Sequence, residues 1–134
     1  MSGSGPRNQR FTVGTGRASL EVAVENSGDG LVVTVFGGDR PHVGTVILAQ
    51  PRPSLSRPGD RSVTSTCLPL LGHQEEALAR PIAETLAREL GVPVVVVAGV
   101  HLEGAQPAEI EAVVALGPAV SGEVLRRCVV SDKS

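Results

Sequence analysis

The sequence of 134 residues contains almost no aromatic side chains. Two Phe are present, with no Trp and no Tyr, so aromatic residues make up only 1% of the chain. Because proteins that bind single-stranded nucleic acid usually stack bases on aromatic rings, this scarcity argues against that class. A hydrophobic core must instead be built from Val, Leu, Ile and Ala, in a chain that is 41% hydrophobic.

The sequence also lacks an excess of basic residues, a closely spaced pair of cysteines and a long apolar run. A net charge of −2 gives no positive excess for nucleic acid or an anionic membrane surface. Cys67 and Cys128 form no CxxC pair, which is typical of free thiols in a reducing compartment. The longest apolar run, VPVVVVAGV at 92–100, is far too short to span a bilayer, and the N-terminus shows no signal segment. We therefore expect a cytoplasmic protein.

The length fits one domain. Residues 1–9 are polar and rich in Gly and Ser, which predicts a disordered N-terminal tail. The expected organisation is a single domain over 10–130, followed by a C-terminal tail at 131–134.

Alternating apolar residues predict an N-terminal antiparallel meander. Its strands are expected at 18–26, 31–36 and 43–50. The proline- and glycine-containing segment 51–62 is expected to be a loop, and its length suggests a functional lid. A short strand over 62–67 follows.

The second half of the chain predicts helices around one more strand. An apolar residue recurs every fourth position in 72–90, where Pro81 predicts a kink or a late helix start and Gly91 a C-cap. The valine-rich run at 92–100 is a buried strand. A helix at 107–116 should end at Gly117-Pro118, and a short third helix is favoured beyond it. The fold class is therefore α+β, a mostly antiparallel sheet (the meander plus one later strand) with two or three helices on one face and a dimer partner over the other.

The three histidines all stand at boundaries of predicted elements. His42 lies in the turn FGGDRPHVGTV, His73 just before a helix, and His101 directly after the valine-rich strand. One such histidine is commonly structural, but three at boundaries favour a site. If the strands ending LVVTVFGG and VVVVAGV are parallel neighbours, His42 and His101 emerge at the same end of the sheet.

Two kinds of ligand suit these residues. Three histidines with a carboxylate from Glu75, Glu103 or Glu109 could bind a divalent metal. Alternatively, Gly37 and Gly38 with positive φ could present backbone N–H groups to an anion, with Arg40 adding a guanidinium suited to phosphate. A third interpretation is a hairpin whose glycines serve the turn alone.

Three segments together resemble a known family. GGDRPHVGTV, GHQEEALARPIAETLA and VVVVAGVHLEGAQPAEIEAV are similar in order and spacing to the prenylated-flavin chaperone family, the small D-subunit family of gallate and protocatechuate decarboxylase systems. The resemblance covers roughly residues 19–127.

The resemblance implies a carrier and not an enzyme. Such a protein would bind prenylated FMN as cargo, protect it, and pass it to an aromatic acid decarboxylase in a transient complex; a flavin prenyltransferase is a further partner, and a homodimer is expected. The cofactor-binding positions matched to the family are Gly37, Gly38, Pro41, His42, Gly44, Gly99 and His101. Arg40, within the same turn, is expected to bind the phosphate with them. A metal, if bound, would be held by His42, His73, His101 and Glu109.

Two other functions stay open at this point. The first is a small metal-dependent enzyme that uses His42, His73 and His101 as ligands. The second is a purely structural accessory subunit of a decarboxylase.

Overall fold

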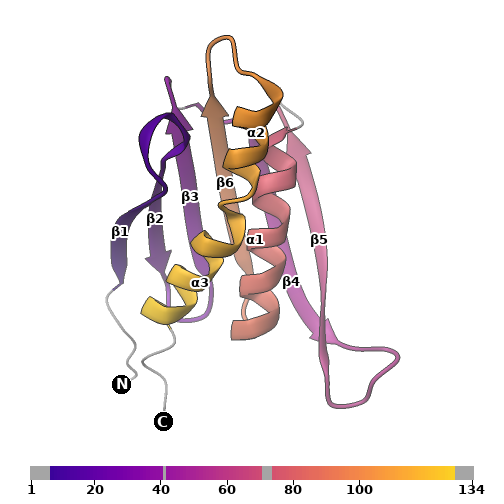
Figure 1. Cartoon of the computed structure of the whole chain (residues 1–134). Helices are drawn as coiled ribbons and strands as arrows, with labels where there is room; N and C mark the ends of the chain where they lie inside the picture. Colours follow the sequence, from indigo (N-terminus) through magenta and orange to yellow (C-terminus); the bar gives the residue numbers. More distant parts are fainter. Residues whose placement is uncertain (1–6, 41, 71–73, 129–134) are drawn as a thin grey trace.

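A computed structural model describes residues 7–40, 42–70 and 74–128. In this part of the chain, one six-stranded sheet carries three helices on the same face (Figure 1). The α+β prediction, with a mostly antiparallel sheet, is confirmed. The pairs β1–β2, β2–β3, β4–β5 and β4–β6 are antiparallel, and β3–β6 is parallel.

The elements follow one another in two groups of strands and helices. The strands are β1 (Asn8–Val13), β2 (Leu20–Asn26), β3 (Leu31–Gly38), β4 (Thr45–Pro53), β5 (Arg61–Pro69) and β6 (Val94–His101). A 3-10 turn, η1 (Gly16–Ala18), joins β1 to β2, and the helices are α1 (Gln74–Leu90), α2 (Pro107–Val114) and α3 (Gly117–Cys128). The ordered strands thus begin at Asn8, two residues before the predicted domain.

The strand order corrects the predicted meander. β6 lies between β3 and β4, so the order is β1-β2-β3-β6-β4-β5 and the second and third predicted strands do not pair. The physical reason is that β6 is a nearly continuous run of β-branched valine, and such a strand gains most at the centre of a sheet, where both of its edges pair and its side chains contact those of two neighbouring strands.

The core lies between the sheet and α1. Leu78, Ile82 and Leu86 form the predicted stripe of α1 and are at most 1% exposed. Every second residue of β2, β3, β4 and β6 meets this layer, including Val33 and Val96. Burying each Leu or Ile contributes about 1.5–3 kcal/mol, so aliphatic side chains alone supply the core that the missing aromatics would otherwise fill.

The predicted loop at 51–62 is shorter than expected. β4 continues through Pro53 and β5 begins at Arg61, which leaves 54–60 as the connection. β4 pairs with β6 only as far as Ala49, so beyond it one edge of β4 is free. A free edge tolerates Pro51 and Pro53, which have no N–H to donate.

Prolines mark two positions in the helices. Pro81 lies inside α1, which spans Gln74–Leu90, so of the two alternatives drawn from Pro81 the late helix start is excluded. Gly117-Pro118 opens α3, because proline is well suited to the first turn of a helix. The predicted third helix itself is confirmed, and Gly91 adopts a φ of 70° after α1 while its N–H donates to the carbonyl of Ala87, as a C-cap does.

Within the described residues, no helix covers the second face of the sheet (Figure 1). We call it the open face; it carries the side chains that alternate with the core positions of each strand. Val32, Leu48 and Leu68 on this face are 47%, 36% and 61% exposed. Among the described residues, no helix is both long and apolar enough to cross a membrane.

Candidate functional site

The site begins with a crossing of the chain over β6. Because β6 separates β3 from β4, the connection from β3 to β4 must pass over the C-terminal end of β6. We call this connection, residues 39–44, the crossover. It brings His42 and Gly44 onto the last residues of β6, and Gly44 N–H donates to the carbonyl of Ala98 at 2.9 Å.

Two glycines make the crossing sterically feasible. A Cβ at Gly99 would lie 1.3 Å from the carbonyl oxygen of His42. A Cβ at Gly44 would lie 2.8 Å from Cδ of Glu75. Real Cβ contacts are not this short, so glycine at both positions is required for His42 and Glu75 to stand where they do.

Gly37 and Gly38 also serve close packing. Gly38 has a φ of 82°, but Gly37 does not adopt positive φ, so that part of the predicted anion cradle is wrong. A Cβ at Gly38 would lie 2.2 Å from the His101 carbonyl oxygen, and one at Gly37 would lie 2.6 Å from that of Ser19. The glycine pair therefore lets β3 approach β2 and β6 at their ends.

The structure brings His42 and His101 together. β3 and β6 are parallel, with Gly38 opposite His101, so the prediction that the two histidines emerge at one end of the sheet is confirmed. Their ring centroids are 6.1 Å apart, with an interplanar angle of 81°. The side chains are 33% and 40% exposed, which leaves both accessible to a ligand.

Glu75 supports His42 from the first turn of α1. Its carboxylate is nearly buried, with Oε2 3.4 Å from Nε2 of His42 and accepting from the N–H of Val100 at 3.4 Å. Within the described part of the chain, His42 Nδ1 and Glu75 Oε1 are buried without a hydrogen-bond partner. Buried polar atoms without partners are uncommon and often mark functional sites. The sequence named Glu75 only as one of three candidate carboxylates.

An ionic cluster fixes the loops around the crossover. Arg17 contacts Asp39 at 2.9 Å and Glu109 at 2.8 Å, and it donates to the carbonyl oxygen of Glu103 at 2.7 Å. The hydrogen bond from Arg17, followed by that from the N–H of Glu103, holds the pKa of Asp39 below its usual value. The hydrogen bond to Asp39 raises the pKa of Arg17. Sequence reasoning missed Arg17, since nothing local connects η1 to α2.

Glu109 is engaged in this cluster. One of its oxygens accepts from Arg17, and the other accepts from the N–H of Gln106 in the capping box of α2. Its predicted role as a metal ligand would compete with both contacts. Across residues 7–40, 42–70 and 74–128, no three His, Cys, Asp or Glu side chains are arranged to hold a metal ion. The predicted site residues Pro41 and His73 lie outside the described residues.

Arg40 is the most exposed cation beside the histidines. Its guanidinium lies 3.4 Å from Glu103, with side-chain exposures of 71% and 67%. Glu103 also contacts Nε2 of His101 at 3.0 Å. An exposed, loosely held guanidinium next to two imidazoles is a suitable set of donors for a phosphate group.

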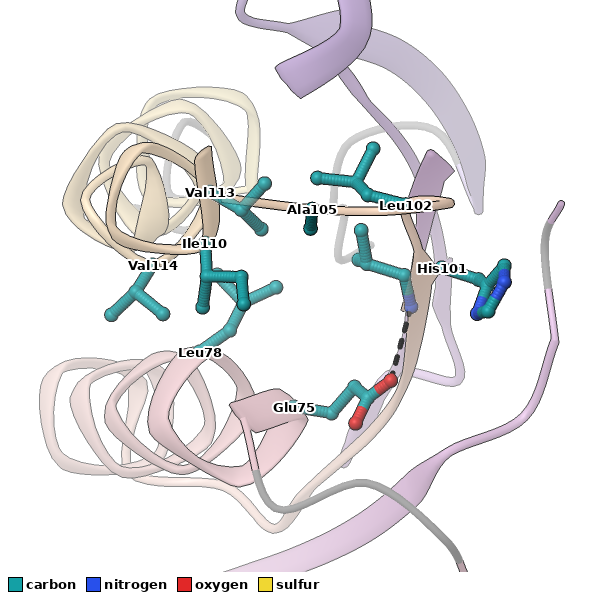
Figure 2. Close-up of a pocket in the computed structure, with 9 residues that line it drawn as sticks. Glu75, Leu78, His101, Leu102, Ala105, Ile110, Val113 and Val114 are labelled. Atoms are coloured by element: carbon teal, nitrogen blue, oxygen red, sulfur yellow. Dashed lines mark hydrogen bonds between the residues drawn. The ribbon is translucent and has the colours of Figure 1, made fainter. Parts of the chain in front are cut away.

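A cavity of about 160 Å³ lies on the other side of β6. Figure 2 shows Glu75 at one end of it and the His101 ring pointing away from it. The described residues that line it are Glu75, Leu78, Val100, His101, Leu102, Ala105, Ile110, Val113 and Val114. A void of this size accommodates a molecule like benzene.

Comparison with solved structures supports the fold. The fold is similar to that of a solved protein described as "Crystal Structure of a Novel Chaperone Complex for Yeast 20S Proteasome Assembly", with a TM-score of 0.61 at 15% identity. The match covers 90% of this chain and 94% of the yeast chain. At this identity the likeness establishes the fold alone. No curated protein compared with the chain matches it.

A match to a protein family identifies the chain more specifically than its fold does. The family described as "Prenylated flavin chaperone LpdD-like domain" matches residues 14–128, which is most of the chain. The chain therefore belongs to this family, and the resemblance drawn from the three sequence segments is confirmed.

Proposed function

We propose that this protein binds prenylated FMN and delivers it to a prenylated-flavin-dependent aromatic acid decarboxylase. The observation that carries this proposal is the family match over residues 14–128. In this role the protein is a carrier and not an enzyme: it shields the cofactor and releases it. A flavin prenyltransferase would supply the cargo, and the partner complex would be transient and cytoplasmic.

We call Arg40, His42 and His101, at the C-terminal ends of β3 and β6, the strand-end site, and it is the proposed binding place for the phosphate. Arg40 can exchange its 3.4 Å contact with Glu103 for a bidentate contact with phosphate oxygens. His42 and His101 stand next to it and can each donate one N–H. The required glycines, above all Gly99, keep the crossover close enough for these donors to converge.

The flavin ring belongs outside the cavity in this proposal. The cavity between α1 and α2, of about 160 Å³, is open to the surface and suits a molecule the size of benzene, so we place the larger tricyclic ring elsewhere. Apolar side chains and backbone on the His101 side of β6 can cover a ring without aromatic stacking. The protein acts as a homodimer, because the open face is apolar and lacks helices (Figure 1).

The test is anaerobic titration of the full chain with prenylated FMN and, separately, with FMN. We expect the wild type to prefer prenylated FMN, and Arg40→Ala and His42→Ala each to weaken binding about tenfold or more. Arg57→Ala is the matched control, since Arg57 is a 78% exposed arginine in the 54–60 connection. A wild type that binds neither flavin contradicts the proposal.

Delivery needs a second measurement. Loaded carrier mixed with apo-decarboxylase should restore decarboxylation and lose its own flavin absorbance. If the decarboxylase is stabilised by a carrier that never held flavin, the protein is a structural subunit instead.

A further inference from the structure

The cavity between β6, α1 and α2 has aliphatic walls and one acidic end. Leu78, Val100, Ile110 and Val113 are among the side chains that line it, and its volume is about 160 Å³. Among its described lining residues Glu75 is the only acidic one, and Figure 2 shows this carboxylate at one end of the space. Aliphatic walls with one strong acceptor suit a small apolar ring that carries a hydrogen-bond donor.

Contacts at both ends of α2 keep this cavity open. At the N-terminal end, Glu109 contacts Arg17 at 2.8 Å and forms the capping box with Gln106. At the C-terminal end, α2 is followed closely by α3, whose Val120 and Val124 are buried in the core. These contacts oppose a movement of α2 toward α1 and β6 that would fill the space. The walls therefore lack packing partners, and a ligand that fills the cavity gains that packing.

Glu75 gives the cavity its chemical preference. The residue is only 6% exposed, and its Oε1 has no hydrogen-bond partner among the described residues. Its Oε2 is already engaged, since it accepts from the N–H of Val100 at 3.4 Å and lies 3.4 Å from Nε2 of His42. A buried acceptor without a partner is costly, and a ligand hydroxyl that donates to this carboxylate would remove that cost.

We propose that this cavity binds a phenol, with the ring against the aliphatic walls and the hydroxyl donating to Glu75. The cavity is open to the surface, and its volume of about 160 Å³ suits a ring the size of benzene. A phenol hydroxyl, with a pKa of about 10, is a stronger donor to a carboxylate than an aliphatic alcohol. An alkylammonium ion is disfavoured, because moving a full charge from water to aliphatic surroundings costs far more than moving a hydroxyl.

Glu75 also connects the cavity to the strand-end site. Its Oε2 contacts His42, while the same carboxylate closes one end of the cavity. A ligand that bonds to this carboxylate changes how His42 is held, and such coupling between two sites is reciprocal. Loss of CO₂ from a hydroxybenzoate leaves a phenol, so the proposed partner enzyme would release this class of molecule. Only the coupling and this source of phenol rest on the proposed function; the phenol site does not.

The experiment titrates the ligand-free full chain with phenol and, separately, with toluene, and follows the methyl ¹³C NMR signals of Leu78 and Ile110. Toluene has the same size but no hydroxyl. A cavity without an acceptor prefers toluene, because phenol gives up its hydrogen bonds to water on entry. We expect a phenol dissociation constant of about 1 mM or lower, and binding about tenfold or more tighter than that of toluene.

Glu75→Gln should bring the affinities for phenol and toluene to within about threefold, because an amide oxygen accepts more weakly than a carboxylate. Ala105→Leu and Ala119→Leu form a matched pair. Ala105 lines the cavity, so leucine there should abolish binding of both ligands. Ala119 is exposed on α3, so its variant should bind both ligands as the wild type does. Circular dichroism checks folding, and Val114→Phe is the second blocking variant if Ala105→Leu is not folded.

Three results would overturn the phenol site. They are a wild type that binds neither ligand at about 10 mM, a wild type that prefers toluene, and a folded blocking variant that binds phenol like the wild type. A Glu75→Gln variant that keeps the full preference for phenol would remove Glu75 as the acceptor.

Anaerobic titration with prenylated FMN, with and without saturating phenol, tests the coupling separately. We expect phenol to change the dissociation constant for the flavin about threefold or more in the wild type, and not in Ala105→Leu. A phenol site without this effect would overturn the coupling and leave the site standing. A chain that binds phenol but no flavin would contradict the proposed function and not the site.

Discussion

The two connections that flank β4 look alike in sequence and differ in structure. The crossover, before β4, lies against β6, and Gly99 beneath it has no room for a Cβ. The 54–60 connection, after β4, is exposed, and a Cβ at Gly59 would meet nothing within 4 Å. Gly59 instead adopts a φ of 90° to close the turn, where the N–H of Asp60 donates to the carbonyl of Arg57.

The difference shows two separate uses of glycine. Under the crossover, glycine makes space for another part of the backbone; in the 54–60 connection, it permits a backbone angle. Only in the first use is the choice of glycine dictated by a segment that lies far away in the sequence. The crossover is therefore the connection in which substitutions should have large effects, and four experiments test this contrast.

The largest effect is expected for Gly99→Ala. Its Cβ would overlap the His42 carbonyl, so the crossover must move and the free energy of unfolding should fall by about 3 kcal/mol. Gly59→Ala is the matched variant and should cost about 1 kcal/mol through its positive φ alone. Urea denaturation of both variants measures the difference. Equal losses would remove the distinction between the two connections.

Glu75→Ala should have the next largest effect. The substitution leaves the Val100 N–H without its acceptor and removes the contact to His42, so unfolding should become easier by about 2 kcal/mol. In the 54–60 connection, Asp60→Ala removes an exposed ion pair at 3.7 Å and should change stability by less than about 0.5 kcal/mol. Thermal denaturation separates these cases. A Glu75 variant as stable as the Asp60 variant would show that the crossover needs no support from α1.

Acid should weaken the crossover through Asp39. Because the folded protein lowers the pKa of this carboxyl, its contribution is present above the usual value of 3.8 and is lost as the pH falls through the lower, folded value. The stability difference between wild type and Asp39→Asn should therefore shrink as the pH falls from 5 toward 2. Urea midpoints over this range provide the measurement, with Asp60→Asn as the control for loss of one surface carboxylate. A difference that stays constant with pH would contradict the assignment.

Shortening the 54–60 connection should have the smallest effect. Replacing residues 55–59 with two turn residues shortens an exposed loop, which should change stability by less than about 0.6 kcal/mol. It should also leave affinity for prenylated FMN unchanged, because this connection does not pack on the strand-end site. Anaerobic titration of the shortened chain tests this expectation. Weaker binding would support the lid that the sequence suggested.

Much of the architecture could be predicted from local pattern, but the position of β6 could not. The alternation in β2 and the period of four in α1 are local signals, and both predicted their elements correctly. The pairing of Leu31–Gly38 with Val94–His101 spans more than fifty residues, and no local signal reports it. From the sequence one could conclude only that His42 and His101 would lie at the same end of the sheet if these two strands were parallel neighbours.

Sequence reasoning could identify only those site residues whose type and position along the chain already suggested a function. His42 and His101 were named because histidines at element boundaries often belong to sites, and Gly44 and Gly99 were named through the family resemblance. Arg17 was missed because its partners, Asp39 and Glu109, lie 22 and 92 residues away. The roles of Gly37 and Gly38 were only partly anticipated, because the need for close packing depends on which strand lies next to them.

The central position of β6 has a consequence for the nascent chain. The ribosome releases β1 to β5 first, as two separate sets of paired strands, β1–β2–β3 and β4–β5, that have no strand between them. Until residue 101 emerges, the inner edges of β3 and β4 are unpaired, and such edges favour aggregation. At roughly 5–20 residues per second, synthesis of residues 70–101 takes about 2–6 seconds. During that interval the half-made sheet is most exposed to misassembly, which makes the β6 valines as important for productive biosynthesis as for the finished core.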